Sequence, residues 1–252
     1  MSTELENTAL AALIFIAALL YASVGHGGAS GYLAAMALLG VSPATMKPTA
    51  LALNIFVSVI ATYKFYRVGA FSWRLFWPLA IVSIPCAYIG GFLTLPGHIF
   101  KPLVGLVLVY AAWGAYKTAN TFSQAPLRSA PLPLLLLSGA ALGLLSGLTG
   151  VGGGIFLSPL MLLLRWAETK VVSGIAAAFI LVNSIAGLLG VLSTKEVALP
   201  AALPYWALAA VIGGYIGAEF GSKRLSNPSI RKLLALVLLV AGAKMLATAS
   251  IM

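Results

Sequence analysis

Two glycine clusters decide the fold of this chain: GHGGA at residues 25–29 and GVGGG at residues 150–154. Each cluster lies inside a long apolar stretch. Glycine costs about 1 kcal/mol relative to alanine inside a helix, so a dense cluster interrupts the helix that contains it. Glycine also permits positive φ and lets the backbone approach its neighbours closely. The sequence therefore predicts a broken helix at each cluster.

The composition places the chain in a membrane. Of its 252 residues, 61% are hydrophobic and 8% are charged, whereas a soluble domain carries about 25% charged residues. Backbone groups in lipid must be paired within the protein, and the sequence has no short alternating strands, so we predict an all-α, polytopic protein. The first residues include Glu4 and Glu6 but no basic residue, so we expect the first apolar run to be retained as a membrane segment.

A polar, proline-rich break separates two series of apolar runs. We interpret residues 1–119 as a first membrane repeat, residues 120–131 as a linker and residues 132–252 as a second membrane repeat. The apolar runs lie at roughly residues 8–24, 28–41, 47–63, 75–95, 102–118, 132–148, 154–164, 171–192, 201–220 and 233–250.

The two halves resemble each other. Met36 and Met161 stand at the same offset as the glycine clusters, and the colinear order of such matches indicates duplication. With the N-terminus outside, 11 Lys and Arg residues fall inside and 4 fall outside, which favours this orientation. Five segments per half is an odd number, so we predict inverted repeats, a plan that recurs in secondary transporters.

The segments after the clusters, residues 28–41 and 154–164, are short for full spans, and each is either a short span or a half-helix that re-enters the membrane. Their N-termini would present N–H groups and a partial positive charge. A pseudo-two-fold axis would bring both ends together as an anion site near the midplane. Close helix packing is the interpretation for a second set of glycines: Gly90, Gly91, Gly213, Gly214 and Gly217.

Polar side chains in otherwise apolar segments add candidate residues. His26 either holds an anion or a proton, or is a neutral imidazole bonded to a carbonyl of the broken helix. Asparagine amides and serine hydroxyls can donate to an oxyanion or to a neighbouring helix. The predicted substrate-binding set is Gly25, His26, Gly27, Gly28, Ala29, Asn54, Ser58, Gly150, Gly152, Gly153, Gly154, Asn183 and Ser184.

Two charged residues have competing interpretations. Lys47, before Pro48 at an expected helix start, either draws anions to the mouth of the site or snorkels to the interface, and we favour the second. Glu219 either carries a coupling proton or forms a solvated boundary pair with Lys223, and again we favour the second.

The glycine loops and the stretches that follow them resemble the sulfite exporter TauE/SafE family of bacterial membrane proteins. The first stretch reads PATMKPTALALN at residues 43–54, and its counterpart runs from TKVVSG at residues 169–174 to Asn183-Ser184. The resemblance covers nearly the whole chain. It implies an inner-membrane permease for small sulfur-containing anions such as sulfite or sulfonates, coupled to H⁺ or Na⁺. The resemblance therefore implies two partners, a small anion and the lipid bilayer.

Other functions remain open at this point. A transition-metal permease would need soft or borderline ligands, and the chain has one Cys, two His and six Met residues. A non-transporting structural subunit would also explain the sparse polar groups. HExxH and GxSxG motifs are absent from the sequence, so we predict no enzyme activity. We also predict no cofactor, no metal site and, because the basic residues are scattered, no nucleic-acid partner.

Overall fold

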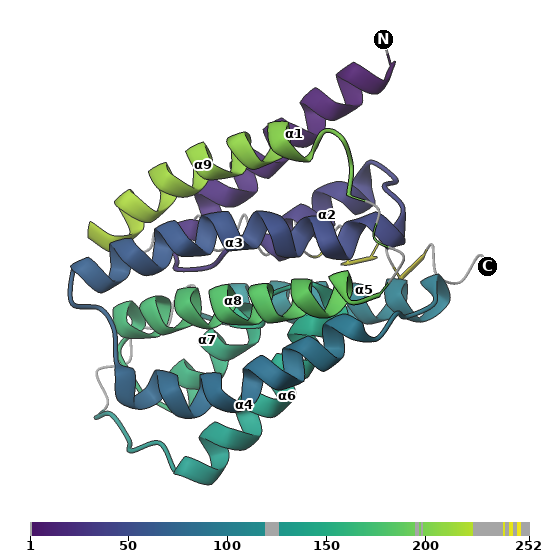
Figure 1. Cartoon of the computed structure of the whole chain (residues 1–252). Coiled ribbons are helices and arrows are strands. Elements are labelled where there is room, and N and C mark those ends of the chain that lie inside the picture. Colours follow the sequence, from purple (N-terminus) through teal and green to yellow (C-terminus); the bar gives the residue numbers. More distant parts are fainter. Residues whose placement is uncertain are drawn as a thin grey trace.

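The computed structural model describes residues 2–118, 126–194, 197, 199–223, 239, 242–243 and 246–247. The regular secondary structure within these ranges is α-helical throughout (Figure 1). The helices are α1 (Ser2–Ala22), α2 (Ala29–Leu38), α3 (Pro43–Arg67), α4 (Trp73–Phe92), α5 (Gly97–Thr118), α6 (Leu132–Thr149), α7 (Gly154–Leu163), α8 (Thr169–Leu192) and α9 (Leu203–Lys223).

Six of these helices, α1, α3, α4, α5, α6 and α8, are long and apolar enough to cross a membrane. The prediction of an all-α, polytopic protein is therefore confirmed. Most of the tenth predicted run, residues 233–250, lies outside the described residues, as does the linker segment 120–125.

The two halves present the same order of helices. Helices α1 to α4 contain 21, 10, 25 and 20 residues, and α6 to α9 contain 18, 10, 24 and 21. In each half the glycine cluster separates a long helix from the short one. At 1.5 Å per residue, α2 and α7 are each about 15 Å long, which is half of the roughly 30 Å hydrocarbon core. Neither can span the membrane alone.

The two halves interlock through their long helices. The most extensive packing joins α4 to α6, α1 to α9, α4 to α8 and α3 to α8, and α3 also packs on α9 (Figure 1). Exchanging the halves turns the α1–α9 pair into the α6–α4 pair and the α3–α9 pair into the α8–α4 pair. The α3–α8 pair is unchanged. This is the contact pattern that a two-fold relation between the halves would produce.

Glycines let these helices approach each other backbone to backbone. At four-residue spacing along α6, a Cβ added to Gly139, Gly143 or Gly147 would lie within 3 Å of a carbonyl oxygen of α4. The glycines assigned to packing from the sequence behave in the same way, so that interpretation is confirmed. Their close contacts run from Gly90 to α6, from Gly91 to α8, from Gly213 and Gly217 to α1, and from Gly214 to Val57 of α3.

Replacing Gly147 by alanine should destabilise the protein. The added methyl group would meet the Ala87 carbonyl oxygen and the Gly91 nitrogen, and backbone atoms cannot move aside as a flexible side chain can. We expect Gly147→Ala to lower the free energy of unfolding by about 1–3 kcal/mol, measured as a lower thermal midpoint in detergent. Gly97→Ala is the control, because nothing lies within 4 Å of its added Cβ. Equal midpoints for the two variants would contradict this account of the packing.

Candidate functional site

Positive φ angles at glycine produce both helix breaks. Gly25 and Gly28 have φ of 77° and 104°, and Gly150, Gly152 and Gly153 have φ of 78°, 84° and 78°. L side chains rarely adopt this region, so these positions favour glycine. No non-glycine residue of either cluster has a positive φ, which explains how the first cluster accommodates a histidine. The last glycine before each short helix, Gly28 or Gly153, is its left-handed N-cap.

Both glycine loops meet at the side chain of Asn54, which is completely buried in α3. Its Oδ1 accepts a hydrogen bond from the Ala29 N–H at 3.0 Å, the first residue of α2. Its Nδ2 donates to the Val151 carbonyl at 3.3 Å and to Ser184 Oγ of α8 at 3.3 Å. One amide therefore connects the first loop, the second loop and the facing helix of the other half.

Close packing confirms that the two loops are neighbours. A Cβ added to Gly27, Gly152 or Gly154 would lie within 3 Å of the Ile180 side chain of α8. The Tyr32 hydroxyl of α2 donates to the Gly27 carbonyl at 2.7 Å. The loops are thus held between α3 and α8, and both short helices begin at this point.

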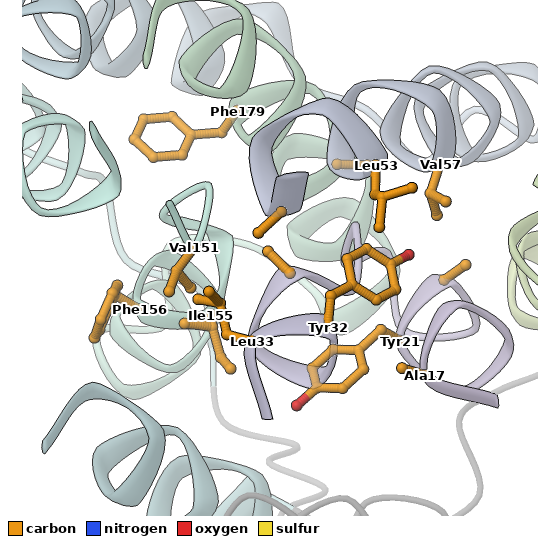
Figure 2. Close-up of a cluster of buried hydrophobic side chains, with 14 of the residues drawn as sticks. Ala17, Tyr21, Tyr32, Leu33, Leu53, Val57, Val151, Ile155, Phe156 and Phe179 are labelled. Atoms are coloured by element: carbon orange, nitrogen blue, oxygen red, sulfur yellow. The ribbon is translucent and has the colours of Figure 1, made fainter. Parts of the chain in front are cut away.

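Apolar side chains from both halves seal the region. Figure 2 shows Tyr21 and Tyr32 below Leu53 and Val57 of α3. Val151 of the second loop lies to their left in the same view. All five belong to one buried cluster. The polar groups of the loops therefore lie in an apolar surround, where each unpaired group is costly.

Comparisons with known proteins agree with this architecture. The model of the family described as "Sulfite exporter TauE/SafE" matches residues 10–245. The chain belongs to the sulfite exporter TauE/SafE family.

Curated relatives extend this result. The probable membrane transporter protein y4hK of Sinorhizobium fredii is 43% identical over 246 residues, covering 96% of this chain and 99% of the relative. The probable membrane transporter protein YjnA of Bacillus subtilis is 27% identical, covering 92% and 96%. A probable membrane transporter of Methanocaldococcus jannaschii is 27% identical, covering 75% and 74%. No solved structure matches the chain.

Membership in the TauE/SafE family confirms the resemblance drawn from the glycine loops. It makes the chain a membrane transporter and confirms the prediction that it is not an enzyme. A transporter also implies a small transported substrate and a lipid bilayer around the helices.

His26 connects the first loop to the short helix of the second half. Its Nε2 lies 2.8 Å from the Ser158 hydroxyl oxygen in α7, 132 residues away. The imidazole also contacts the Tyr21 ring, with the ring centroids 6.2 Å apart. The sequence singled out His26 as a candidate, and the structure places it between α1 and α7.

The remaining predicted side chains divide into two groups. Ser58 Oγ donates to the Asn54 carbonyl of its own helix at 2.5 Å, and Ser184 accepts from Asn54. Asn183 Nδ2 donates to the Phe179 carbonyl at 2.7 Å, but its Oδ1 has no hydrogen-bond partner in the described part of the chain. Asn183 is completely buried, so an unpaired amide oxygen there is unusual.

Ser146 of α6 is a candidate that the sequence analysis missed. It is completely buried, and its Oγ has no hydrogen-bond partner among the described residues. Its Cβ lies 3.4 Å from the position of a Cβ added to Gly153, and the ring of Phe179, one turn before Asn183, lies 2.8 Å from the same position. One unpaired hydroxyl thus lies beside the second loop, and the unpaired amide oxygen of Asn183 lies one helical turn beyond a ring that packs on the same loop. A buried serine four residues before a glycine cluster was the available signal.

Lys47 does not extend its ammonium into water, so the snorkelling interpretation favoured from the sequence is wrong. It is 9% exposed, and its Nζ donates to the carbonyls of Gly90, Gly91 and Leu93 at 3.0, 2.9 and 3.0 Å. These carbonyls end α4 and have no further helical turn to bond. The end of α4 draws the ammonium inward. By contrast, the pair of Glu219 with Lys223 is confirmed, and Lys64 of α3 joins it.

Removing the Asn54 amide should destabilise the protein more than removing a hydroxyl bonded within one helix. Asn54→Ala leaves the Ala29 N–H and the Val151 carbonyl buried without this partner, which costs about 1–3 kcal/mol per group. We therefore expect a thermal midpoint in detergent clearly below that of Ser58→Ala, whose hydroxyl serves only α3 carbonyls. If Asn54→Ala and Ser58→Ala have the same thermal midpoint, Asn54 does not hold the loops together.

Proposed function

We propose that the chain is a secondary transporter of small anions, most of all sulfur-containing anions such as sulfite and sulfonates, by alternating access around the paired glycine loops. The observation that carries this proposal is that the two loops leading into the N-termini of α2 and α7 meet at Asn54. Unpaired N–H groups and the helix dipole favour negative charge at such ends. Opposed half-helices around one point are a recurrent substrate site in transporters.

The side chains around the loops suit an oxyanion. Asn54, Asn183, Ser146 and Ser184 are neutral and can donate hydrogen bonds without the desolvation cost of a full charge. The Ala29 N–H and the Asn54 amide already serve each other. An anion would therefore bind by separating the loops and exchanging these bonds for bonds of its own. The glycines supply the conformational freedom for that exchange.

The arrangement of charge supports a single orientation in a bacterial inner membrane, with the N-terminus outside. The last turn of α3 carries Lys64 and Arg67, and the last turn of α9 carries Lys223. Both helix ends are joined at Glu219, which pairs with Lys64 and Lys223. A concentration of basic residues at one end of the bundle is typical of the cytoplasmic side. The same pairing supports inverted halves. The C-terminal ends of α3 and α9 lie together, although α3 is the third helix of the first half and α9 is the fourth helix of the second. Halves with the same orientation would place these two ends on opposite sides of the membrane.

Coupling to an ion gradient completes the proposal. H⁺ or Na⁺ would drive the anion against its gradient. His26 is the candidate for a proton route, because an imidazole changes charge near neutral pH and this one joins the first loop to Ser158 of α7.

A transport assay tests the proposed function. Purified protein in liposomes should accumulate labelled sulfite or methanesulfonate when an H⁺ or Na⁺ gradient is imposed, and should not carry Ni²⁺ or Co²⁺. Uptake of metal ions with no uptake of any anion would overturn the proposal.

Asn183→Leu separates transport from folding. Because Asn183 Oδ1 lacks a partner, an apolar residue of similar size should leave the thermal midpoint unchanged or raise it. An amide nitrogen has two hydrogens, and the Phe179 carbonyl accepts one bond from Asn183 Nδ2. Losing the other N–H donor should reduce anion uptake about tenfold, which corresponds to one hydrogen bond of about 1.4 kcal/mol. Ser83→Ala, which removes a buried hydroxyl bonded only to the Ala80 carbonyl, should transport normally. Full uptake by Asn183→Leu would place the substrate elsewhere.

A further inference from the structure

Lys47 holds a buried positive charge in a fixed position. An ammonium has three hydrogens to donate, and the carbonyls of Gly90, Gly91 and Leu93 accept all three at 2.9–3.0 Å. These acceptors come from the C-terminal end of α4, whereas Lys47 belongs to α3. The side chain has no free donor left to swing toward a ligand. Its charge therefore acts from one place.

No carboxylate of the described residues pairs with Lys47. Its three hydrogen-bond partners are neutral carbonyls. Among the acids that the structure describes, Glu219 is taken by Lys64 and Lys223. The others, Glu4, Glu6 and Glu168, are exposed. The field of a buried and unneutralised charge is screened by salt far less than that of a surface lysine.

The backbone and the side-chain stem of Lys47 adjoin the second glycine loop. A Cβ added to Gly150, the first residue of the loop, would lie 3.1–3.3 Å from the carbonyl oxygen, Cα and Cγ of Lys47. The stem of the lysine thus packs directly against the backbone that leads to α7. For any singly charged ligand bound within about 10 Å of the ammonium, at an effective dielectric constant near 20, the Coulomb energy changes the binding constant by about tenfold or more.

We propose that Lys47 determines the charge selectivity of the transport site. Its ammonium favours anions without touching them, and it favours doubly charged anions over singly charged ones, because the Coulomb energy is proportional to the charge of the ligand. The inference rests on the proposed function, since it takes the paired loops as the place where the anion binds.

The competing role for Lys47 is a helix cap. Basic side chains often bond the last carbonyls of a helix, and such a cap requires donors but not a net charge. A cap lost by mutation would weaken the binding of every substrate alike. If the charge of Lys47 instead attracts the anion, its removal would weaken the binding of a doubly charged anion more than that of a singly charged one.

The test compares Lys47→Gln with the wild-type protein in liposomes. Glutamine keeps two N–H donors for the α4 carbonyls and removes the charge. The probes, both used near neutral pH so that the lysine stays protonated, are methanesulfonate, which carries one charge, and sulfate, which carries two. We expect the half-saturating concentration to rise about tenfold for methanesulfonate and about a hundredfold for sulfate. Lys47→Arg, which keeps the charge, should preserve the wild-type ratio.

Lys101→Gln is the matched control, because Lys101 also precedes a proline near the start of a helix, in α5, but is partly exposed. It should change both half-saturating concentrations by less than about twofold, as expected for a screened charge. If Lys47→Gln does not fold, Lys47→Met, which has no charge at any pH and a side chain of similar length, supplies the uncharged variant.

The outcomes separate the inference from the function beneath it. Equal changes for the two anions, or no change, would overturn the role of Lys47 while leaving the anion transporter standing. A wild-type protein that carries neither anion would overturn the proposed function and the inference with it.

Discussion

The structure depends on pairing the backbone of two broken helices inside a membrane. Lipid offers no hydrogen-bond partners, so irregular backbone at that depth persists only where the protein supplies them. Asn54 does so with both ends of one amide. Its oxygen accepts from the start of α2, and its nitrogen donates to the carbonyl of Val151 in the other half. A residue with only donors or only acceptors could not serve both loops.

The interlocked halves place this amide where it can act. Asn54 lies on α3, which packs against α8 and α9 of the other half. Glycines bring the helix backbones close together, as at the contact of Gly91 in α4 with Gly187 in α8. At such short separations even small side chains reach the neighbouring helix. In a transporter such an arrangement has a dynamic meaning. The short helices pack less extensively than the long helices do, so we expect the loops and the short helices to be the part that opens at least cost.

The sequence predicted what is decided locally. Glycine density located both breaks, and the length of the apolar runs predicted the short α2 and α7. It could not predict the partners of those breaks. The bond from Asn54 to the second loop joins residues 97 apart, and the bond from His26 joins residues 132 apart. Lys47 shows the limit most clearly. In sequence it is a lysine before a proline at a helix start, and only the end of α4, 43–46 residues away, makes it a buried cation.

Neutral groups that bind the anion and a separate charge that attracts it together suit the requirements of transport. A site must attract its substrate yet release it on the other side, so binding strong enough to trap the anion would stop the cycle. A lysine in direct contact with the anion would form a desolvated ion pair that is costly to break. Because the α4 carbonyls occupy every hydrogen of Lys47, its charge can raise the affinity for anions without contact. The neutral groups at the loops then make bonds weak enough to exchange.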